Sequence, residues 1–518
     1  MKVSLSTWTL VVFLFMAVFS IAQATAPGPV YSNPVLGGDY PDPSIIRVGD
    51  DYWATATSSE WAPHFPLLHS RDLVNWEVVG AVFHAKPEWA QTNFWAPEIS
   101  EYKGRYYVMY TARRKNGPLC VASASSDKPQ GPYKDNGPLV CQEDGSIDGF
   151  SIADENGQRY LIWKNDGNSR NQPTILWAQP LSEDATKLLG EKKELIRNDA
   201  PWERAVVEGP FVQRRNGFFY LFYAGNACCG LKCEYAVGVA RAKKLLGPWE
   251  KYSGNPIIKD DDEWRCPGHG SIVEDAKGRT FFMYHAYNKR GSVYVGREPV
   301  VDEILWQDTG WPFVKGAGVS VSAPAPLGVG GKNLEYTVDD KFSGLALDPL
   351  WHWPLNSPPK ITVGNGLKLS PSTNPQTFLA AVIARATVSP DYTAETEVLA
   401  PAKGHAGISA FGDLNNAIGI GVQNGTLTLW ELRENKMRTL ATGKVRKSAP
   451  VRLRVAAKDG HTVQFSFSSD EGKSWKDLGD NLSAMFLPPW DRSIRLALFT
   501  GGSLEPAQFT YFRMKASR

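Results

Sequence analysis

Short aromatic runs recur along the first part of the chain, and each follows a charged stretch that ends in glycine. The central aromatic residues of these runs are Tyr52, Tyr106, Tyr160, Tyr220 and Phe282, which lie 54 to 62 residues apart. A glycine turn between two apolar runs is typical of a β-hairpin. Each of the five repeats therefore predicts at least one hairpin.

The length of the repeat favours a β-propeller over a solenoid. Two or more hairpins per repeat make a sheet of about four strands, which is the size of one propeller blade. A solenoid is the alternative, but solenoid repeats usually span roughly 20 to 50 residues, less than the spacing found here. We predict an all-β fold, with a five-bladed β-propeller over residues 30–318.

The pattern changes after the last repeat. Residues 316–338 are rich in Gly, Ala and Pro, which is typical of a linker, and we place the linker at 319–338. Beyond it, apolar and polar positions alternate between turns, with Asp459-Gly460 marking one hairpin. This alternation predicts a two-sheet β-sandwich over residues 339–518.

The N-terminus has the features of a secretory signal. Lys2 supplies a positive charge, residues 10–19 an apolar run, and residues 22–24 (Ala-Gln-Ala) a small-residue cleavage site. An uncleaved membrane anchor is the alternative, but the apolar run is shorter than the ~20 residues of a span. We predict a signal peptide over residues 1–24, and a mature protein that is secreted or periplasmic and free of the membrane.

Charge and composition limit the kinds of partner that the chain is expected to bind. The chain has 56 basic and 54 acidic residues, which gives it no basic surface suited to nucleic acid. Its 18 Trp, 19 Tyr and 23 Phe supply aromatic surface for flat ligands. We therefore expect neither nucleic acid nor an anionic membrane as a partner.

The six cysteines of an exported chain predict disulfides. Six cysteines allow about 15 pairings, and we prefer Cys120 with Cys141 because both flank one predicted hairpin region. The cluster Cys228-Cys229-x3-Cys233 would also suit a metal site, but no second ligand pair with zinc-like spacing follows it.

Equivalent positions in the repeats carry unusual side chains. Nine residues before the hairpin glycine, repeats two to five have Trp95, Asp148, Glu208 and His269, and Asp42 lies seven residues before the first such glycine. Equivalent positions of successive blades should converge on one end of the central channel. An Asp before Pro or Gly is usually a turn former, and a lone His is usually structural. Three carboxylates at matching positions instead favour a functional site.

The segments that hold these residues resemble glycoside hydrolase family 43, a family of five-bladed propellers that act on arabinan, arabinoxylan and xylo-oligosaccharides. The matching segments are YPDPS (40–44), HSRDLVNWEVVG (69–80), FWAPE (94–98), SIDG (146–149), VEGP (207–210), PGHGS (267–271), and Gly296-Arg297 followed by DTGWPFV (308–314). Segments 339–353, 468–475 and 509–516 resemble the concanavalin-A-like sandwich often appended to family 43 xylosidases and arabinofuranosidases.

The resemblance implies roles for the three carboxylates. Asp42 would be the general base and Glu208 the general acid, while Asp148 would tune the pKa of the acid and orient it. This division agrees with what glycoside hydrolysis needs, one proton donor and one carboxylate that handles the incoming nucleophile. The family inverts the anomeric configuration, with a water molecule between base and sugar.

The resemblance also implies lesser roles. Arg297 would touch the sugar in the −1 subsite, and Trp95 would line the pocket wall. His269 would lie near a water-coordinated metal ion, such as a structural calcium or another cation on the propeller axis. No cofactor is expected for the chemistry itself.

The expected activity is exo-acting, the release of α-L-arabinofuranosyl or β-D-xylosyl residues from the non-reducing ends of plant cell-wall polysaccharides or oligosaccharides. An endo-1,5-α-L-arabinanase is the alternative, because YLIWKNDG (160–167) and LLGPWEKY (245–252) are similar to arabinan-directed members. Galactan-directed activity, a non-catalytic carbohydrate-binding propeller and a protein-interaction propeller are the remaining hypotheses. The sandwich either binds carbohydrate or, as we favour, packs on the propeller and shapes the pocket.

Overall fold

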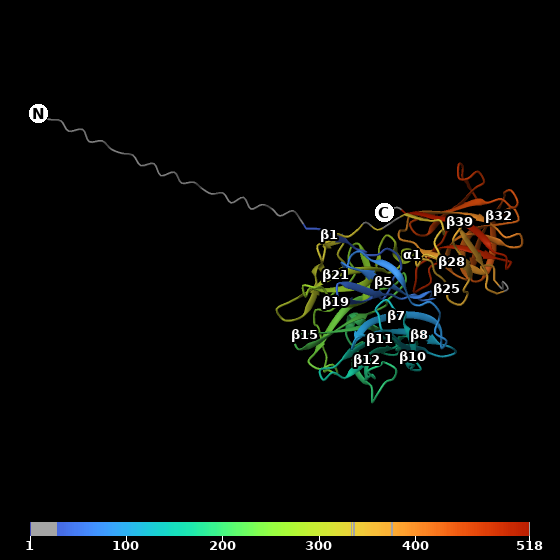
Figure 1. Ribbon diagram of the computed structural model, residues 1–518. Coiled ribbons are helices and arrows are strands. Elements are labelled where there is room, and N and C mark those ends of the chain that lie inside the picture. The colour runs from blue at the N-terminus through green and yellow to red at the C-terminus, as the bar shows by residue number, and fades with distance from the viewer. Residues whose placement is uncertain (2–27, 333, 335–336, 374–376, 517–518) are drawn as a thin grey trace.

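The computed structural model describes Met1 and residues 28–332, 334, 337–373 and 377–516, and these fold almost entirely as β-structure (Figure 1). The predicted signal peptide, apart from Met1, lies outside the described residues. Within the described part, no helix is long and apolar enough to cross a membrane. The fold class is all-β, as predicted.

Five antiparallel sheets of four strands follow one another along residues 44–314. Blade I is β2 (Ser44–Val48), β3 (Asp51–Thr55), β5 (His64–Ser70) and β6 (Glu77–Phe83); blade II is β7 (Ala90–Tyr102), β8 (Arg105–Arg114), β9 (Leu119–Ser126) and β10 (Lys134–Val140); blade III is β11 (Ser146–Ala153), β12 (Arg159–Asn165), β13 (Ile175–Pro180) and β14 (Lys193–Arg197). Blade IV is β15 (Val207–Arg215), β16 (Phe218–Gly225), β17 (Ala236–Ala242) and β18 (Glu250–Lys251), and blade V is β19 (Trp264–Glu274), β20 (Thr280–Asn288), β21 (Glu298–Trp306) and β22 (Pro312–Val314). The short helices are η1 (Gly167–Arg170), η2 (Pro201–Glu203), α1 (Ser292–Val295) and η3 (Lys315–Ala317).

The innermost strands β2, β7, β11, β15 and β19 contact one another in that order, and β19 contacts β2. The ring is therefore closed, and the five sheets form a five-bladed β-propeller around a channel lined by these strands. The aromatic residues that define the repeat lie on the second strand of each blade. Tyr52, Tyr160, Tyr220 and Phe282 are buried, and Tyr220 and Phe282 belong to one apolar cluster between blades IV and V.

The C-terminal part forms two sheets that face each other across an apolar core. One sheet runs β26 (Lys360–Thr362), β27 (Leu367–Ser370), β39 (Ala507–Ala516), β29 (Tyr392–Leu399), β34 (Val451–Lys458), β35 (Thr462–Ser468) and β36 (Lys476–Asp477), with β24 (Thr337–Asp340) and β37 (Leu482–Ser483) beside it. The other runs β28 (Ala381–Ala386), β38 (Arg495–Gly501), β30 (His405–Asp413), β31 (Asn416–Gln423), β32 (Thr426–Arg433) and β33 (Lys436–Lys444). Every second residue of β29 and of β34 is buried, which is the pattern of a sheet with one face on a core. The predicted β-sandwich is confirmed.

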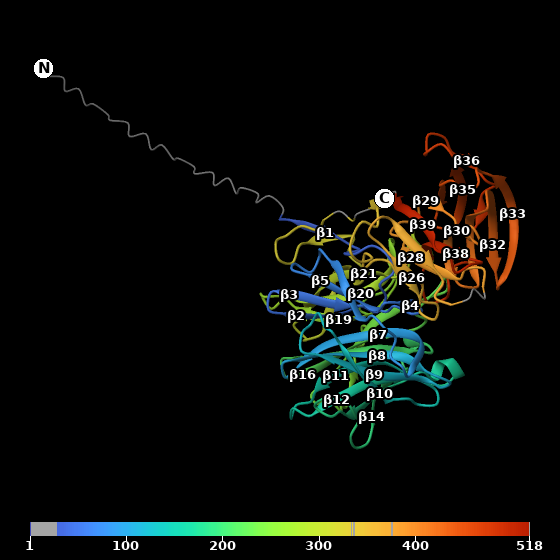
Figure 2. The same cartoon turned by 45° about the vertical axis from the view of Figure 1, so that its right-hand side comes forward.

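Two small sheets join the parts of the chain. β23 (Ser322–Pro324), inside the predicted linker, pairs with β1 (Val30–Ser32). β25 (Trp353–Pro354) pairs with β4 (Trp61–Ala62) of the propeller, and Figure 2 shows β4 on the side of the propeller that faces the sandwich. The glycine-rich stretch therefore contains a strand packed on the propeller, and the sandwich docks beside blade I.

All six cysteines are paired. Cys120 and Cys141 form the predicted disulfide in blade II. Cys233 joins Cys266, and the neighbours Cys228 and Cys229 are bonded to each other. Paired cysteines leave no thiolates for a metal, so the alternative interpretation of the Cys228–Cys233 cluster does not hold.

Candidate active site

In each blade, a residue in the left-handed backbone region lies just before or within the innermost strand. These residues are Asp42, Ala96, Asp148, Gly209 and His269, with φ between 40° and 59°. In blades II to V they coincide with breaks in the pairing register, which is the signature of a β-bulge. A bulge turns a side chain away from its place in the pleat. The side chains of Asp148 and His269 are therefore turned toward the channel end instead of into the blades, and Asp42 has the same left-handed backbone just before β2.

The left-handed residues show which positions are equivalent in the blades, and they differ in part from the count of nine residues before the hairpin glycine. Counting nine residues back from the hairpin glycine is right for Asp148 and His269 but one residue off in blades II and IV, where Ala96 and Gly209 are equivalent. Trp95 and Glu208 therefore each lie one residue before the left-handed residue of their blade. A Cβ at Gly209 would lie only 2.8 Å from Cγ of His269, so glycine lets the backbone next to Glu208 approach the His269 ring.

Asp42 is held as a carboxylate. Thr57 Oγ1 donates to Oδ2 at 2.6 Å, and Arg297 Nη1 donates to Oδ1 at 3.1 Å. Burial by itself would raise the pKa of Asp42, but the Arg297 guanidinium above all, with the Thr57 hydrogen bond among the smaller contributions, lowers it to about 2. Asp42 is therefore ionised throughout the neutral and mildly acidic range.

His285 fixes the backbone of Asp42. Its Nδ1 accepts the Asp42 N–H at 3.0 Å, so in this tautomer Nε2 carries the proton. Burial and the nearby Arg297 hold the pKa of His285 well below its ordinary value, and the ring is neutral. The 3.3 Å approach of His285 Nδ1 to Asp42 Oδ1 is therefore not an ion pair.

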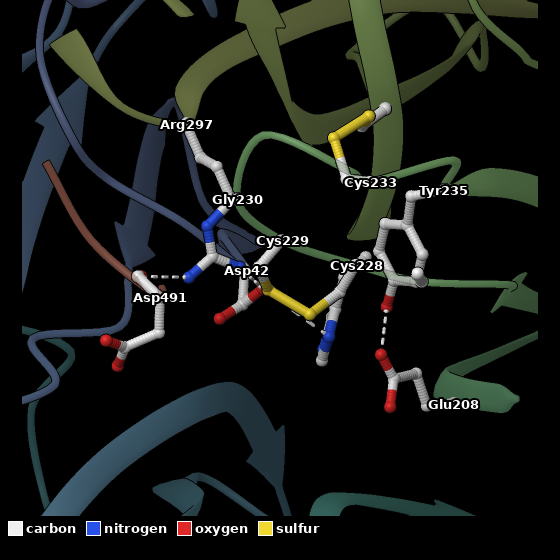
Figure 3. The surroundings of a disulfide bond; sticks show 12 residues. Asp42, Glu208, Cys228, Cys229, Gly230, Cys233, Tyr235, Arg297 and Asp491 are labelled. Atoms are coloured by element: carbon white, nitrogen blue, oxygen red, sulfur yellow. Dashed lines mark hydrogen bonds and ion pairs between the residues drawn. A yellow bond between two sulfur atoms is a disulfide. The ribbon is translucent and has the colours of Figure 1, made fainter. Parts of the chain in front are cut away.

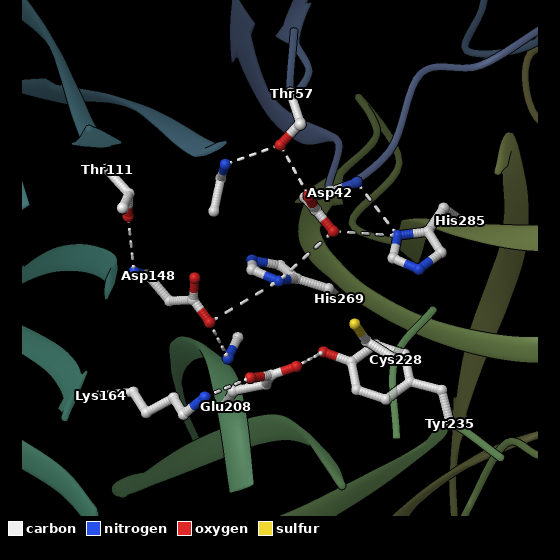
Figure 4. A network of polar contacts seen from close by, with 12 residues as sticks. Asp42, Thr57, Thr111, Asp148, Lys164, Glu208, Cys228, Tyr235, His269 and His285 are labelled. Atoms are coloured by element: carbon white, nitrogen blue, oxygen red, sulfur yellow. Dashed lines mark hydrogen bonds and ion pairs between the residues drawn. The ribbon is translucent and has the colours of Figure 1, made fainter. Parts of the chain in front are cut away.

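Glu208 lies on the other side of His269 from Asp42 (Figure 4). Lys164 Nζ donates to Oε2 at 2.7 Å, and the Tyr235 hydroxyl donates to Oε1 at 2.8 Å. Burial alone would lower the pKa of Lys164, but the charges of Glu208 and its neighbours raise it above the ordinary value, so the ammonium persists. The two donors fix both oxygens of Glu208.

Asp148 connects the two sides of the site. Its backbone N–H donates to Thr111 Oγ1 at 3.0 Å, and its Oδ2 accepts the N–H of Gly209, next to Glu208, at 3.0 Å. Burial, and then the charge of Glu208 against the opposing effect of His269, raises the pKa of Asp148 to about 6. Asp148 thus orients the backbone at Glu208 and retains a proton into the mildly acidic range.

His269 lies between the carboxylates, with Nδ1 3.6 Å from Asp42 Oδ1 and 3.9 Å from Asp148 Oδ2. Calcium prefers six to eight oxygen ligands, and no group of three or more His, Cys, Asp or Glu suited to a metal occurs among the described residues. The donors here do not fit a directly coordinated calcium. A cation held through water beside His269 stays a prediction.

The sandwich reaches this site through the loop that holds Trp490 and Asp491. Arg297 Nη2 donates to the Asp491 carbonyl at 2.8 Å (Figure 3), so one guanidinium joins Asp42 to the sandwich. The rings of Trp95 and Trp490 meet edge to face at 5.8 Å, and Trp490 is 61% exposed. The site thus has an aromatic border made by both parts of the chain.

Sequence reasoning missed several of these groups. Lys164 had a usable signal, because it is a charged residue inside the apolar strand run YLIWKN (160–165) and had to be paired once buried. Tyr235, His285 and Asp491 had none, since nothing in their local sequence indicates that they approach the carboxylates.

Comparison with known proteins agrees with this geometry. Residues 31–312 match the family described as Glycosyl hydrolases family 43. The chain belongs to glycosyl hydrolase family 43. The match covers all three carboxylates and ends within the fifth blade.

Family 43 relatives resemble the chain to different extents. Xylosidase/arabinosidase 43B of Humicola insolens is 31% identical over 317 residues, and xylosidase/arabinosidase of Butyrivibrio fibrisolvens is 30% identical over 302 residues. The matched region spans about half the length of these curated relatives, 56% of each. The crystal structure of the GH43 protein BlXynB of Bacillus licheniformis is 25% identical, with a TM-score of 0.81 over 94% of this chain and 100% of that one. Both the propeller and the sandwich therefore have counterparts in a single solved chain.

Proposed function

We propose that the protein is an inverting glycoside hydrolase that releases α-L-arabinofuranosyl or β-D-xylosyl residues from non-reducing ends. Its substrates would be plant cell-wall arabinan, arabinoxylan or xylo-oligosaccharides. The observation that carries the proposal is the placement of Asp42 and Glu208 on opposite sides of His269, in blades I and IV, with different partners (Figure 4). Relatives named as xylosidase/arabinosidase support the substrate class.

In the proposed reaction, water attacks the anomeric carbon and transfers a proton to Asp42, which is ionised. Glu208 gives a proton to the glycosidic oxygen as the bond to the anomeric carbon breaks. Asp148 supports this step in two ways. It holds the backbone beside Glu208 through the Gly209 N–H, and its like charge favours keeping one proton on the pair.

The position of the sandwich supports exo action. The edge-on pair of Trp95 and Trp490 stands beside the carboxylates, as expected of a site closed on one side. Endo-arabinanase activity is the second candidate, because an extracellular endo-alpha-(1->5)-L-arabinanase 1 of Bacillus subtilis is 25% identical over 293 residues. Galactan-directed activity is a weaker candidate. A non-catalytic carbohydrate-binding propeller or a protein-interaction propeller would not need three carboxylates in this arrangement.

Export is part of the proposal. The predicted signal peptide, residues 1–24, would carry the protein to the cell exterior or periplasm, where cell-wall polysaccharides are met. Paired cysteines agree with an oxidising compartment.

The proposal is tested by substrate and by leaving group. Purified protein should release sugar from an aryl β-D-xyloside or an aryl α-L-arabinofuranoside faster than it cuts linear arabinan. Glu208→Gln should lower kcat/KM on natural glycosides by about 10²–10⁴, the usual contribution of a general acid. Because dinitrophenolate leaves without protonation, the same variant should keep most activity on dinitrophenyl glycosides. Equal losses on both would remove Glu208 from the acid role.

The anomeric configuration of the product tests whether Asp42 acts as the general base. If Asp42 activates water, the first product seen by proton NMR, before mutarotation, has inverted configuration, and Asp42→Ala abolishes turnover. A retained configuration, or a glycosyl azide of retained configuration after added azide, would instead make one of the aspartates a nucleophile about 5–5.5 Å from the acid.

A further inference from the structure

A bond between neighbouring cysteines lies beside the candidate catalytic residues. Cys228 and Cys229 sit in the loop that joins β16 to β17 in blade IV. On β16, Ala224 is paired with Glu208, so the loop begins at the end of the blade from which Glu208 projects. Figure 3 shows the sulfur–sulfur bond between Asp42 and Tyr235, and Figure 4 shows the Cys228 sulfur beside the Tyr235 ring.

The loop is held from several sides. The Gly230 N–H donates to the Tyr287 hydroxyl at 3.2 Å, and Arg265 Nη2 donates to the Leu231 carbonyl at 2.8 Å. The Cys233–Cys266 disulfide ties the loop to β19, the strand that carries His269. The position of the two sulfur atoms is therefore built in before any ligand arrives.

Stability does not account for the bond between Cys228 and Cys229. A disulfide stabilises mainly by closing a long loop in the unfolded chain, and adjacent cysteines close no loop beyond their own dipeptide. The Cys233–Cys266 bond already ties this loop to blade V. Both Cys228 and Cys229 are only half-buried, so they keep surface that a ligand can cover.

The chemistry of the disulfide complements its neighbours. Asp42, Glu208 and Arg297 present charged hydrogen-bonding groups, which suit hydroxyls and the glycosidic oxygen. A disulfide has no donor, accepts only weakly, and presents a polarisable apolar surface. A sugar ring has polar edges and apolar C–H faces, and pocket sites usually combine apolar contact with a few placed polar groups.

We propose that the Cys228–Cys229 disulfide is the apolar platform for the C–H face of the glycosyl residue that is cleaved. It is then a specificity-determining contact of the site, and this rests on the proposed glycosidase function. The platform favours a ring whose C–H face can lie flat against the sulfur atoms while its hydroxyls face the charged groups.

The first test replaces the platform in the full chain. The double variant Cys228→Ala/Cys229→Ala should raise the KM for the preferred aryl glycoside, and the Ki of the released L-arabinose or D-xylose, by about tenfold. Its Tm should stay close to that of the wild type. Leu231→Ala, an exposed change in the same loop, is the control and should leave KM and Ki unchanged. A folded double variant with unchanged KM and Ki overturns the platform but leaves the glycosidase function intact, whereas an inactive wild type overturns the function.

A second test needs no variant. A water-soluble phosphine reduces a disulfide to two thiols and takes oxygen from water to become the phosphine oxide. L-arabinose or D-xylose at about ten times its Ki should slow reduction of Cys228–Cys229 about tenfold, because only about a tenth of the sites stay free. Thiols are trapped by alkylation and counted by mass spectrometry, with Cys120–Cys141 in blade II as the internal control. An equal rate with and without the sugar overturns the platform, even if the double variant does not fold.

Discussion

At the scale of single residues, Asp42 and Asp148 lie in the same site but differ in their protonation. The Arg297 guanidinium lies 3.1 Å from Asp42, and together with the Thr57 hydrogen bond it outweighs burial and lowers the pKa of Asp42 to about 2. Asp148 lacks such a close cation, so burial and the charge of Glu208 raise its pKa to about 6. Neighbouring charges, not residue type, thus keep Asp42 ionised above about pH 2 and let Asp148 retain a proton up to about pH 6.

These states predict the pH dependence of the free enzyme. The proposed reaction needs Asp42 ionised, which holds above about pH 2, and it needs a proton in the site, where Asp148 loses its own proton as pH rises through about 6. We therefore expect kcat/KM to fall by up to about tenfold per pH unit on the alkaline side. A profile that rises from pH 6 to 8 would contradict this assignment.

The variant Asp148→Asn tests whether the charge of Asp148 helps the site to retain its proton. Removing the carboxylate removes the like charge that helps to retain the proton, so the alkaline limb of kcat/KM should move to lower pH. Asp154→Asn, in the exposed hairpin turn of the same blade, is the matched control and should leave the profile in place. A shift of the limb to higher pH would show that Asp148 does not act through its charge.

At the scale of elements, the bulges in the innermost strands of blades II to V redirect the chain in a way that sequence position does not reveal. They turn Asp148 and His269 out of the pleat, while in blade IV the turn falls on Gly209. The hairpins are similar in all five blades, so the site arises from a repeated backbone irregularity filled by different side chains.

Gly209→Ala should show how tightly that irregularity is packed. Gly209 and Gly217 have φ of 59° and 78°, but a Cβ at Gly209 meets His269 at 2.8 Å, whereas one at Gly217 meets nothing within 4 Å. Gly217→Ala should therefore lower the free energy of unfolding by only ~1–2 kcal/mol. Gly209→Ala should cost more and lower kcat at least about tenfold, because His269 must move. Equal losses in urea unfolding, with kcat unchanged, would show that His269 adjusts freely.

At the scale of the whole molecule, the sandwich is part of the site. Asp39 accepts the Arg297 N–H and the Ser493 N–H, both at 2.9 Å, and so joins the backbones of the two parts. Among the tryptophans of the sandwich, Trp351 and Trp430 are buried, whereas Trp490 is exposed beside Trp95. These contacts favour pocket-shaping over independent binding for the sandwich.

Trp490→Ala tests this role. The ring is exposed, so its removal should change the free energy of unfolding by less than about 0.5 kcal/mol. Losing an aromatic contact of about 0.5–1.5 kcal/mol should raise the KM for oligosaccharides roughly two- to tenfold. Met485→Ala, an exposed apolar residue of the same domain, is the control. An unchanged KM would place Trp490 outside the path of the substrate.

The sequence by itself determined the architecture and the three carboxylates. The aromatic strand and its hairpin glycine are local features repeated five times, and local periodicity is enough to specify hairpins and blades. Asp42, Asp148 and Glu208 stand in short ordered motifs, so their identity needed no knowledge of contacts. The Cys120–Cys141 pair could be predicted because it lies within one blade.

Only the tertiary structure decided how these residues act. Arg297 and Asp491 meet across 194 positions of sequence, Lys164 and Glu208 across 44, and Tyr235 and Glu208 across 27. No local pattern encodes such approaches, because they depend on how blades and sandwich pack. The left-handed turns are likewise hidden, since Asp, Ala, Gly and His all occupy them. Protonation states follow from those distances and from burial, so they arise only when the chain has folded.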